Sequence, residues 1–461
     1  MRTKPRTDPT SWEYQAAIHG TYLARPLSQW NQCRHGSWYF VSWHRMYLYY
    51  FERIVRAQVV TNGGPRDWAL PYWNYAGGGN HNTLPPAFRS PTLAGGSKNP
   101  LNVAQRNPGI NAGAGLPASI TSPAFALSRP TFTGRSEFGG GRTSPLGQFL
   151  SETGRLEQTP HNDIHVAIGG LMGDPDTAAQ DPIFWLHHAN IDRLWWLWEQ
   201  RHRNPTDVAW TGQSFDFVDA GGGSATLTGV DVLDTERQLG YTYYQAVARP
   251  LLPFEEKPRM QVKWPWPWPE RPEVPQPSSA DAGGDVEPLR SLVGATDKPI
   301  RLVGEEARVP IAIDERATQS LSGKAAAVVP QHRAFLDIEG IDAERNPGTV
   351  YGVYVNLPEQ PTQDDLATHH VGNISLFGVE RARNPRGDEQ AHGLRVSMEI
   401  TELLDRLAAE GTWQEGGRVE VALRPITLEP PEDRAEGAAQ IAPTGHPDTP
   451  ITIGRISVQF A

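Results

Sequence analysis

Six histidines in two groups of three constrain the fold of this chain more than any other feature. The first group ends at residue 44 and the second begins at residue 161. The members are His19, His35 and His44 in the first group, and His161, His165 and His188 in the second. Neutral imidazole is a ligand for copper, zinc, iron and nickel, so the ligand type alone leaves the metal open. The duplication predicts two metal ions, each held by three imidazoles.

Taken one at a time, these histidines are weak signals. His161 and His165 are four residues apart and share one face of a helix, yet such a pair is often solvated or part of a core. His44 alone is equally typical of a core histidine. Both groups, however, fall on aromatic-rich segments in one half of the chain. Inward ligands on four helices are a recurrent way to build a two-metal centre.

Composition excludes several function classes. A chain of 461 residues is long enough for two domains or more. The formal net charge of −10 argues against a nucleic-acid partner, because phosphate binding needs a concentrated basic surface. No apolar run is long enough to span a membrane. The first residues contain no apolar segment typical of a secretory signal, which favours a cytoplasmic location.

The N-terminal half, residues 1–245, is predicted to be mainly helical. Residues 12–60 indicate two helices around a loop, and helical patterns return at 145–168 and 183–201. The stretch 76–145 is rich in Gly, Ser, Asn and Pro and predicts a long irregular insertion. We therefore expect a four-helix bundle around the metals, with long loops.

The C-terminal half is predicted to be an all-β domain. Residues 246–297 include the run KWPWPWPERPEVP, which predicts an extended Pro-rich linker. Beyond about residue 298, five short alternating runs between turn signals are typical of a sandwich or barrel, and we expect a sandwich-like domain over 298–461. They are TVYGVYVNL, GNISLFGV, GLRVSMEI, GRVEVALRPI and TIGRISVQF. The run SMEITELLDRLAAEG predicts one helix among them.

Two long sequence patterns contain several of these histidines. The first joins an early histidine, two aromatic residues, a His-Arg pair and a glutamate; the second joins Asp-Pro, two aromatic residues, a histidine and an aspartate. The matching residues are His35, Phe40, Trp43, His44, Arg45 and Glu52, then Asp181, Pro182, Phe184, Trp185, His188 and Asp192. Both patterns resemble those of the type 3 copper protein family, which includes tyrosinases, catechol oxidases and the oxygen-carrying haemocyanins. In this register His188 is the ligand and His187 its neighbour. The resemblance covers roughly residues 12–245 and implies two copper ions with O₂ as co-substrate.

The resemblance also implies the reaction. A bacterial-type tyrosinase or polyphenol oxidase hydroxylates a monophenol to a catechol and oxidises the catechol to an o-quinone. Two alternatives remain open: a catechol or o-aminophenol oxidase without monophenol hydroxylation, and an oxygen carrier like haemocyanin. Expected partners are a small phenol and O₂, together with a protein that loads copper. The C-terminal domain is expected to shield the active site, as in similar latent enzymes.

The single cysteine, Cys33, excludes an internal disulfide. A buried, small apolar residue is the commonest fate of such a cysteine. The plant enzymes of the family carry a cysteine four residues after the first ligand, where this chain has Leu23. Fungal tyrosinases instead have it two residues before the second ligand, as Cys33 is to His35. The resemblance therefore implies a Cys33–His35 thioether.

The resemblance assigns roles to several further residues. Glu157 and Asn162 correspond to the pair that holds a proton-accepting water in similar tyrosinases, a general-base role, with Glu152 as the rival carboxylate. Arg45 and Asp192 are expected to orient ligands and helices. Thirteen residues before His188, where plant catechol oxidases have a bulky Phe, this chain has Pro175, which predicts an open approach for phenols. The Tyr241–Tyr243 tract resembles the motif that ends the catalytic domain.

Overall fold

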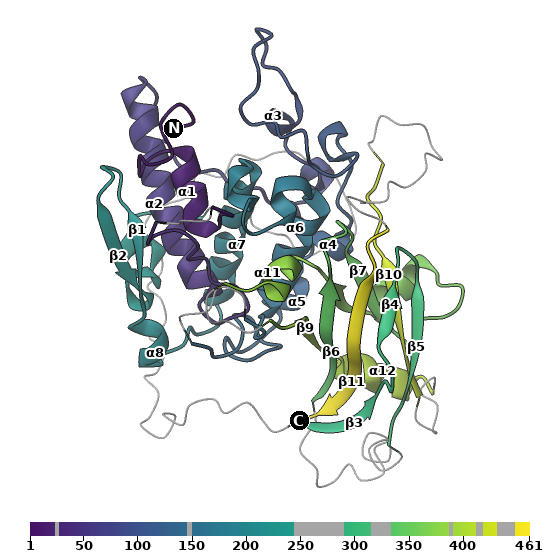
Figure 1. The fold of residues 1–461 in the computed structure, drawn as a ribbon. Coiled ribbons are helices and arrows are strands. Elements are labelled where there is room, and N and C mark those ends of the chain that lie inside the picture. Colours follow the sequence, from purple (N-terminus) through teal and green to yellow (C-terminus); the bar gives the residue numbers. More distant parts are fainter. Residues whose placement is uncertain are drawn as a thin grey trace, which may run out of the picture.

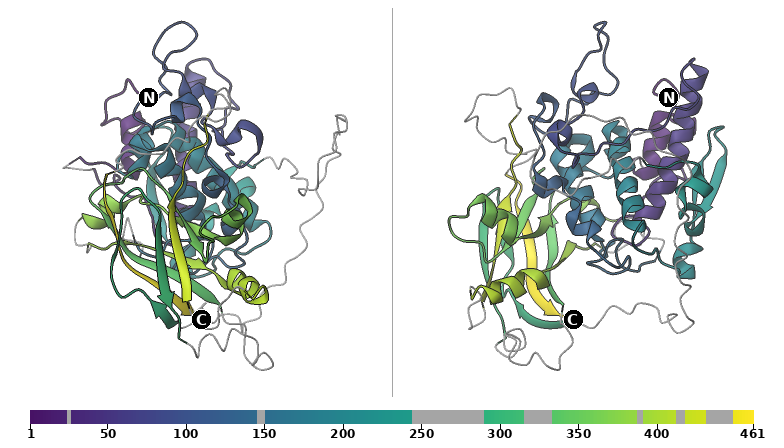
Figure 2. Two further views of the ribbon diagram at one scale, coloured as in Figure 1. Left: turned by 90° about the vertical axis from the view of Figure 1, so that its right-hand side faces the viewer. Right: turned by 180° about the vertical axis from the view of Figure 1, so that it is seen from behind.

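The fold consists of a mainly helical N-terminal part and a β C-terminal part that lie against each other (Figures 1 and 2). The computed structural model describes residues 1–23, 27–144, 150–243, 290–314, 333–386, 391–411, 418–430 and 448–461. The expected order of a helical half followed by a β half is confirmed. The Pro-rich residues 246–289 lie outside the described residues.

Four helices dominate the N-terminal part: α1 (Trp12–His19), α2 (Phe40–Thr61), α6 (Asp163–Ile168) and α7 (Ile183–Glu199). The side chain of Ser11 caps α1 by accepting from the Tyr14 amide at 3.1 Å. Helices α2 and α7 pack together through their aromatic faces; Phe51 stacks on Trp185 with ring centroids 3.3 Å apart. The two helices predicted within 12–60 and the one within 183–201 are thereby confirmed.

The helical stretch predicted over 145–168 is shorter than expected. Its regular part is α6, which is preceded by the π-turn η3 (Glu157–Asn162). Pro160 lies inside this turn and has no backbone N–H, so the series of helical backbone hydrogen bonds is interrupted there. After α6 come the short 3₁₀ turns η4 (Gly170–Gly173) and η5 (Ala178–Gln180).

The stretch 76–145 is largely irregular, as predicted. Its described residues form short helical elements of three or four residues: η1 (Gly79–Asn82), α3 (Pro86–Arg89), η2 (Ile110–Ala112), α4 (Ala118–Thr121) and α5 (Ala124–Leu127). A buried ion pair ties it to the start of α7, with Arg106 donating to both oxygens of Asp181 at 2.7 and 2.8 Å. The insertion is therefore anchored to the helix that carries His188.

An antiparallel hairpin in the N-terminal part was not predicted. It pairs β1 (Ser214–Val218) with β2 (Ser224–Thr228), between α8 (Val208–Thr211) and the turns η6 (Gly229–Val232) and η7 (Thr235–Leu239). Phe217 faces inward and packs on Trp43 and Tyr50 of α2. The hairpin thus covers one side of the helix that carries His44.

The C-terminal part is a sandwich of two antiparallel sheets. One sheet has the order β5-β10-β7-β8, and the other β3-β11-β6-β9, with β4 also paired to β11. The bounds are β3 (Ser291–Ala295), β4 (Ile300–Leu302), β5 (Ala307–Ala312), β6 (Ala334–Ala343), β7 (Tyr351–Val355), β8 (His370–Ile374), β9 (Leu394–Glu399), β10 (Arg418–Pro425) and β11 (Ile451–Phe460). Inward side chains of both sheets, such as Val353, Val421, Ile338 and Ile453, form one core. Among the described residues of this part, three helices accompany the sheets: α10 (Gln363–His369), α11 (Val379–Arg383) and α12 (Thr401–Ala409).

The five predicted runs are the strands β7 to β11, and α12 lies in the run predicted as helical. Strands β3 to β6 were not predicted. Strand β3 falls at Ser291–Ala295, inside the range 246–297 that we predicted as linker, so the end of that range is wrong. It pairs with β11 through backbone hydrogen bonds, which an alternation pattern of five residues does not reveal.

The outer face of the β6–β9–β11 sheet and the segment around α11 contact the helical part. Ser397 of β9 hydrogen-bonds to Ser136 at 2.8 Å, and Arg333 bridges Glu137 and Glu399. Phe377, beside α11, belongs to the hydrophobic core of the helical part.

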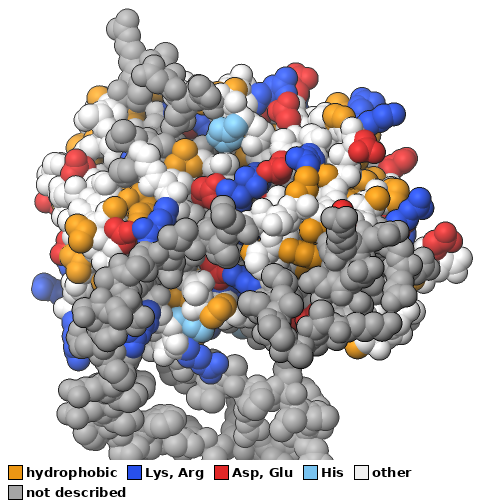
Figure 3. Space-filling view, turned by 90° about the horizontal axis from the view of Figure 1, so that it is seen from below, with side chains coloured by type: hydrophobic (Ala, Val, Ile, Leu, Met, Phe, Trp, Pro, Cys, Tyr) orange, Lys and Arg blue, Asp and Glu red, His pale blue; other side chains and the backbone are white. Residues whose placement is uncertain are grey.

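No described helix is long and apolar enough to cross a membrane. Basic and acidic side chains alternate over the described surface seen from below (Figure 3).

Candidate metal centre

The two groups of histidines meet in the middle of the helical part. His19 ends α1, His44 lies in the second turn of α2, and His188 in the second turn of α7. His161 lies in the π-turn η3 and His165 in α6. His35 comes from the segment between α1 and α2. All six are at most 2% exposed, so the structure buries together the six side chains that the sequence singled out.

Four of the six rings are fixed by a hydrogen bond to Nδ1. Because a carbonyl oxygen only accepts, a ring bonded to one must carry its proton on Nδ1 and present the lone pair of Nε2. The four pairs, at 2.8–2.9 Å, are His19 with Pro175 O, His44 with Phe40 O, His161 with Asn162 Oδ1 and His165 with Met172 O. This arrangement, in which an outer oxygen orients the ring, is the usual one for metal-binding histidine.

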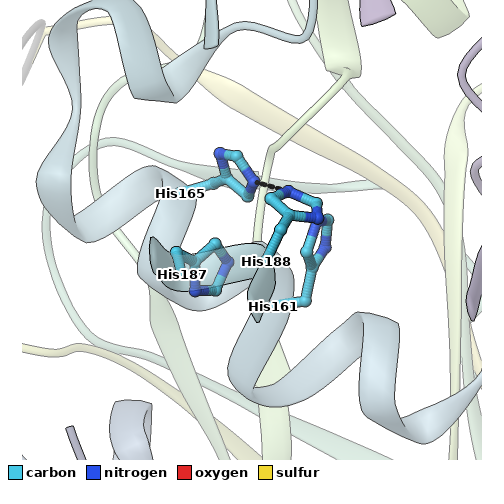
Figure 4. Close-up of side chains that lie close together, drawn as sticks. All are labelled: His161, His165, His187 and His188. Atoms are coloured by element: carbon cyan, nitrogen blue, oxygen red, sulfur yellow. Dashed lines mark hydrogen bonds between the residues drawn. The ribbon is translucent and has the colours of Figure 1, made fainter. Parts of the chain in front are cut away.

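The Nε2 atoms point toward one another. Those of His19, His44 and His161 are buried and have no hydrogen-bond partner among the described residues. The Nε2 atoms of His165 and His188 lie 3.2 Å apart (Figure 4). Buried nitrogen lone pairs without a donor are costly unless a ligand satisfies them, and a metal ion does so.

The donor atoms fall into overlapping sets that fit metal binding. His161, His165, His187 and His188 form one set, and His19, His44 and His188 another, with the atoms of each set within 4.8 Å of one another. His188 therefore lies between the two groups, and its ring stacks on that of His44 at 4.6 Å. The structure also brings His187 among the donor atoms (Figure 4), although the sequence pattern assigned it the role of neighbour.

Burial keeps these rings neutral. Desolvation lowers the pKa of His19 to about 4, against a raising effect of its bond to Pro175. Desolvation likewise lowers the pKa of His35, His44 and His161 well below the usual value. Neutral imidazole is the form that binds copper, so the six rings are ready for it at neutral pH.

Cys33 lies beside His35. Its Sγ and the ring nitrogens of His19 and His35 are within 4.8 Å of one another. The cysteine is 1% exposed, and burial raises the pKa of its thiol to about 12. The thiol is therefore protonated at neutral pH before any reaction.

An ion pair beneath the histidines joins the two long helices. Arg45, next to His44, donates from Nε to Asp192 Oδ1 at 2.5 Å, and both side chains are buried. The hydroxyl groups of Tyr241 and Tyr243 both donate to Asp192 Oδ2 at 2.6 Å. One carboxylate thus holds α2, α7 and the Tyr241–Tyr243 tract together, in line with the orienting role expected for Arg45 and Asp192.

A pocket opens beside the first histidine group. It has an empty volume of about 370 Å³, including the solvent at its mouth, and is lined by His35, Glu157, Asn162, Phe377 and Arg395, among others. Glu157 accepts from the Gly36 amide at 2.8 and 3.0 Å, and burial raises the pKa of its carboxyl group to about 8.

The rival carboxylate, Glu152, is engaged elsewhere. It accepts two hydrogen bonds from the guanidinium of Arg135, at 2.7 and 3.0 Å, and does not line this pocket. Of the two acidic residues that the sequence left open, only Glu157 lies beside the histidines in the described part of the chain.

An aromatic ring from the β part covers the histidines, a feature that the sequence did not reveal. Phe377 stacks on His165, with centroids 4.1 Å apart and planes at 21°, and packs edge-on against His35 and His161 at 5.6 and 5.7 Å. It is 3% exposed. The open approach predicted from Pro175 is therefore wrong for this arrangement, because Phe377 fills the space above the rings.

Comparison with known proteins decides the family. Residues 9–134 and 131–201 match the common central domain of tyrosinase. The chain is 33% identical to tyrosinase HcTyr1 of Hahella sp. (strain CCB-MM4), over 90% of this chain and 88% of the relative. The chain belongs to the tyrosinase family. It is thus an oxidoreductase of the copper-containing phenol oxidases, which use two copper ions and O₂, and the buried histidines fit that cofactor.

The similarity extends over both parts of this family member. It is 26% identical to the chloroplastic polyphenol oxidase of Malus domestica, over 89% of this chain and 69% of the relative. The fold resembles latent apple tyrosinase with a TM-score of 0.59 at 22% identity, covering 100% of this chain and 92% of that one. It resembles a latent aurone synthase with a TM-score of 0.60 at 20% identity, covering 100% and 84%. Residues 290–460 match a domain of unknown function (DUF7868).

Proposed function

We propose that this tyrosinase-family protein is a phenol oxidase that converts monophenols to catechols and catechols to o-quinones. The observation that carries the proposal is the convergence of imidazole Nε2 atoms from two separate segments of the chain. The proposed ligands are His19, His35 and His44 for one copper ion, and His161, His165 and His188 for the other. Helices α1, α2, α6 and α7 are proposed to act as the four-helix frame of this centre.

Copper, when bound, supplies the binding of O₂ and the capacity to accept electrons from the phenol. The residues of the chain supply everything else. The outer oxygens fix each ring, and the buried surroundings exclude water. The overall reaction takes one monophenol and one O₂ to one o-quinone and one water.

Glu157 and Asn162 are proposed to remove the phenol proton. Both line the pocket beside His35, so a water held between the two side chains would face an incoming phenol. The proton would pass from the phenol hydroxyl through this water to the carboxylate. A base works best with a pKa near the operating pH, and burial brings the carboxyl group of Glu157 into that range.

The test of this role compares two substrates. A catechol loses its protons more readily than a monophenol and depends less on the base. Glu157→Gln should therefore reduce monophenol turnover by about 10²-fold, the effect typical of a positioned base, and diphenol turnover much less. Glu152→Gln is the matched control and should leave the ratio of the two activities unchanged. Equal losses on both substrates would make Glu157 structural.

Cys33 is proposed to form a thioether with His35. The proximity of Sγ to the ring supports it. The reaction would join sulfur to a ring carbon, and the thiol hydrogen and the ring hydrogen would pass with two electrons to O₂, which becomes hydrogen peroxide. Such a bond would fix the orientation of His35 without using a donor nitrogen.

The β part, residues 298–461 with the strand β3 before it, is proposed to keep the enzyme latent. Phe377 occupies the position above His165 that a phenol ring would need, and the solved structures with this fold include proteins described as latent. Residues 1–245 would then form the catalytic domain, with the Pro-rich linker between the two.

Oxygen uptake tests the function as a whole. Uptake with a monophenol supports the tyrosinase activity; uptake with a catechol alone, or with an o-aminophenol alone, would reduce the proposal to the corresponding oxidase. Reversible O₂ binding without turnover of either substrate, after removal of the β part by limited proteolysis, would favour an oxygen carrier. The measurement therefore separates the three alternatives.

A further inference from the structure

One short segment, residues 170–177, serves a histidine in each group. The carbonyl oxygen of Met172 accepts from His165 Nδ1, and that of Pro175 accepts from His19 Nδ1, both at 2.8 Å. The two acceptors that orient a ligand of each proposed copper ion are therefore three residues apart. A displacement of this segment would disturb both ions at once.

The segment is internally rigid. The Asp174 carbonyl accepts from the amides of Thr177 and Ala178 at 3.1 and 2.8 Å, and the Thr177 hydroxyl donates to Leu171 O at 2.8 Å. Gly20, directly after His19, packs so closely that a Cβ there would lie 2.5 Å from Pro175 O. Because the segment is hydrogen-bonded and closely packed, a displacement of one of its residues also displaces its carbonyl groups.

The β part holds this segment from outside. Arg381 of α11 pairs with Asp176 Oδ2, and Arg386 donates to Asp176 Oδ1 at 3.1 Å. Asn346 donates from Nδ2 to Gly173 O at 2.9 Å. We call these three residues, Arg381, Arg386 and Asn346, the clamp.

The residues of the clamp and their partners are buried or held in place by further hydrogen bonds. Asp176 is 4% exposed, and a buried carboxylate requires charged partners. Asn346 is itself oriented, because its Oδ1 accepts from the Gly348 amide at 2.9 Å and its own amide donates to Glu380 at 3.1 Å. The contacts of the clamp to Gly173 and Asp176 cross from the β part to a segment that supplies none of the proposed copper ligands, and Arg386 also donates to the Thr21 carbonyl.

We propose that the clamp positions the Met172 and Pro175 carbonyl groups and so strengthens copper binding in both sites when the β part is docked. The β part then retains copper in addition to covering the histidines. Coupling of this kind is reciprocal: bound copper must favour docking to the same extent as docking favours copper. The inference rests on the proposed ligand set, with His19 and His165 in different sites.

The experiment measures copper, not activity. The full chain is loaded with copper, and its affinity is determined by competition with a chelator at equilibrium, for the wild type and for Arg381→Gln combined with Arg386→Gln. Loss of an outer partner of a metal ligand typically costs 10- to 100-fold in metal affinity. The double variant is one step further out, so we expect about a tenfold loss for both ions. Asn346→Ala, a milder change, should act in the same direction.

Two controls separate the clamp from other effects. Arg308→Gln removes a pair with Glu420 on the far sheet and should leave copper affinity unchanged. Arg333→Gln removes an ion pair with Glu137 that also joins the two parts but lies away from residues 170–177, and it should affect the affinity less than the arginine variants of the clamp. An equal loss in Arg333→Gln would overturn the proposal, since any contact between the two parts would then retain copper.

The outcomes also distinguish this inference from the ligand assignment. A wild-type chain that binds fewer than two copper ions would contradict the ligand set itself. Two ions bound with unchanged affinity in the clamp variants would contradict the clamp alone. Hydrogen exchange at residues 170–177 provides the reciprocal test: it should be slower in the copper-loaded protein, and slowed less by copper in the double variant.

Discussion

Under the proposed latency, truncation of Phe377 to alanine should give an enzyme that works without activation. The ring is 3% exposed when the β part is docked and would be solvated when the β part is displaced. The substitution therefore weakens the docked form and leaves the displaced form almost unchanged.

The magnitude follows from the contacts. Phe-to-Ala changes in a core cost about 3–5 kcal/mol. The low end, about 3 kcal/mol, applies here because the vacated space adjoins the pocket beside His35 and can take up water. Since 1.4 kcal/mol is a tenfold change in an equilibrium, the displaced population should rise roughly 100-fold, up to full opening.

The assay is the initial rate of catechol oxidation in copper-loaded protein, before and after limited proteolysis. In the wild type, proteolysis should raise the rate strongly; in Phe377→Ala, the untreated rate should already be near the treated one. Leu376→Ala is the control, because Leu376 points into the core of the sandwich rather than at the histidines. A Phe377→Ala protein that binds two copper ions yet stays as inactive as the wild type would refute the covering role.

Three further predictions concern the centre itself. Replacing His188 by Ala should remove one of two copper ions and abolish activity, whereas replacing His187 should keep both ions and only weaken it; metal analysis decides. Copper-loaded protein should be about two daltons lighter than the unmodified chain, and Cys33 should resist alkylation after denaturation, because a thioether has no thiolate. Asp192→Ala should cost about 3–5 kcal/mol of stability, measured by denaturant unfolding, because it leaves Arg45 buried without its main partner.

These predictions have matched comparisons. If the His187 variant instead loses one of the two copper ions, then His187 rather than His188 is the ligand. Full alkylation of Cys33 in copper-loaded, denatured protein would exclude the thioether. Asp342→Ala breaks an ion pair with Arg383 whose side chains are 41% and 46% exposed, and should cost below about 1 kcal/mol. Equal costs at the two aspartates would refute the argument from burial.

The helices that carry the histidines could be predicted because their signals are local. Trp43, Tyr47, Phe51 and Ile54 repeat at helical spacing, and all four are buried in α2. The π-turn before α6 could not be placed, since it depends on how Pro160 is accommodated. The hairpin β1–β2 has only a weak signal in the sequence, two aromatic residues in alternation before a Gly-rich turn.

The C-terminal sheets show a different limit. Strand β6 carries Asp337 between Leu336 and Ile338, an alternation that suggests one exposed face. Asp337 is nevertheless buried, because that face is covered and the carboxylate pairs with Arg290 and Arg395. Burial of a sheet face by residues that are distant in the sequence cannot be predicted from the alternation of polar and apolar residues within one strand.

The clustering of the histidines could be predicted from the sequence, whereas the ring that covers them could not. The histidines follow helical spacing and long family patterns along the chain, and the structure brings them together. Phe377 is one of several apolar residues in a strand-like run, and nothing in that run distinguishes it from Leu376. The two adjacent side chains enter different cores, which only the packing of the two parts reveals.

The shared carboxylate of Asp192 sets a limit on how the chain can be shortened. Tyr241 and Tyr243 both donate a hydrogen bond to it, so the end of the helical part is held against α7, the helix that carries His188. A protease that cuts after Tyr243 would leave both hydrogen bonds to Asp192 intact, so the helical part should stay active. A cut a few residues earlier would remove these bonds and destabilise the helix that carries His188, so the same cleavage should inactivate the enzyme.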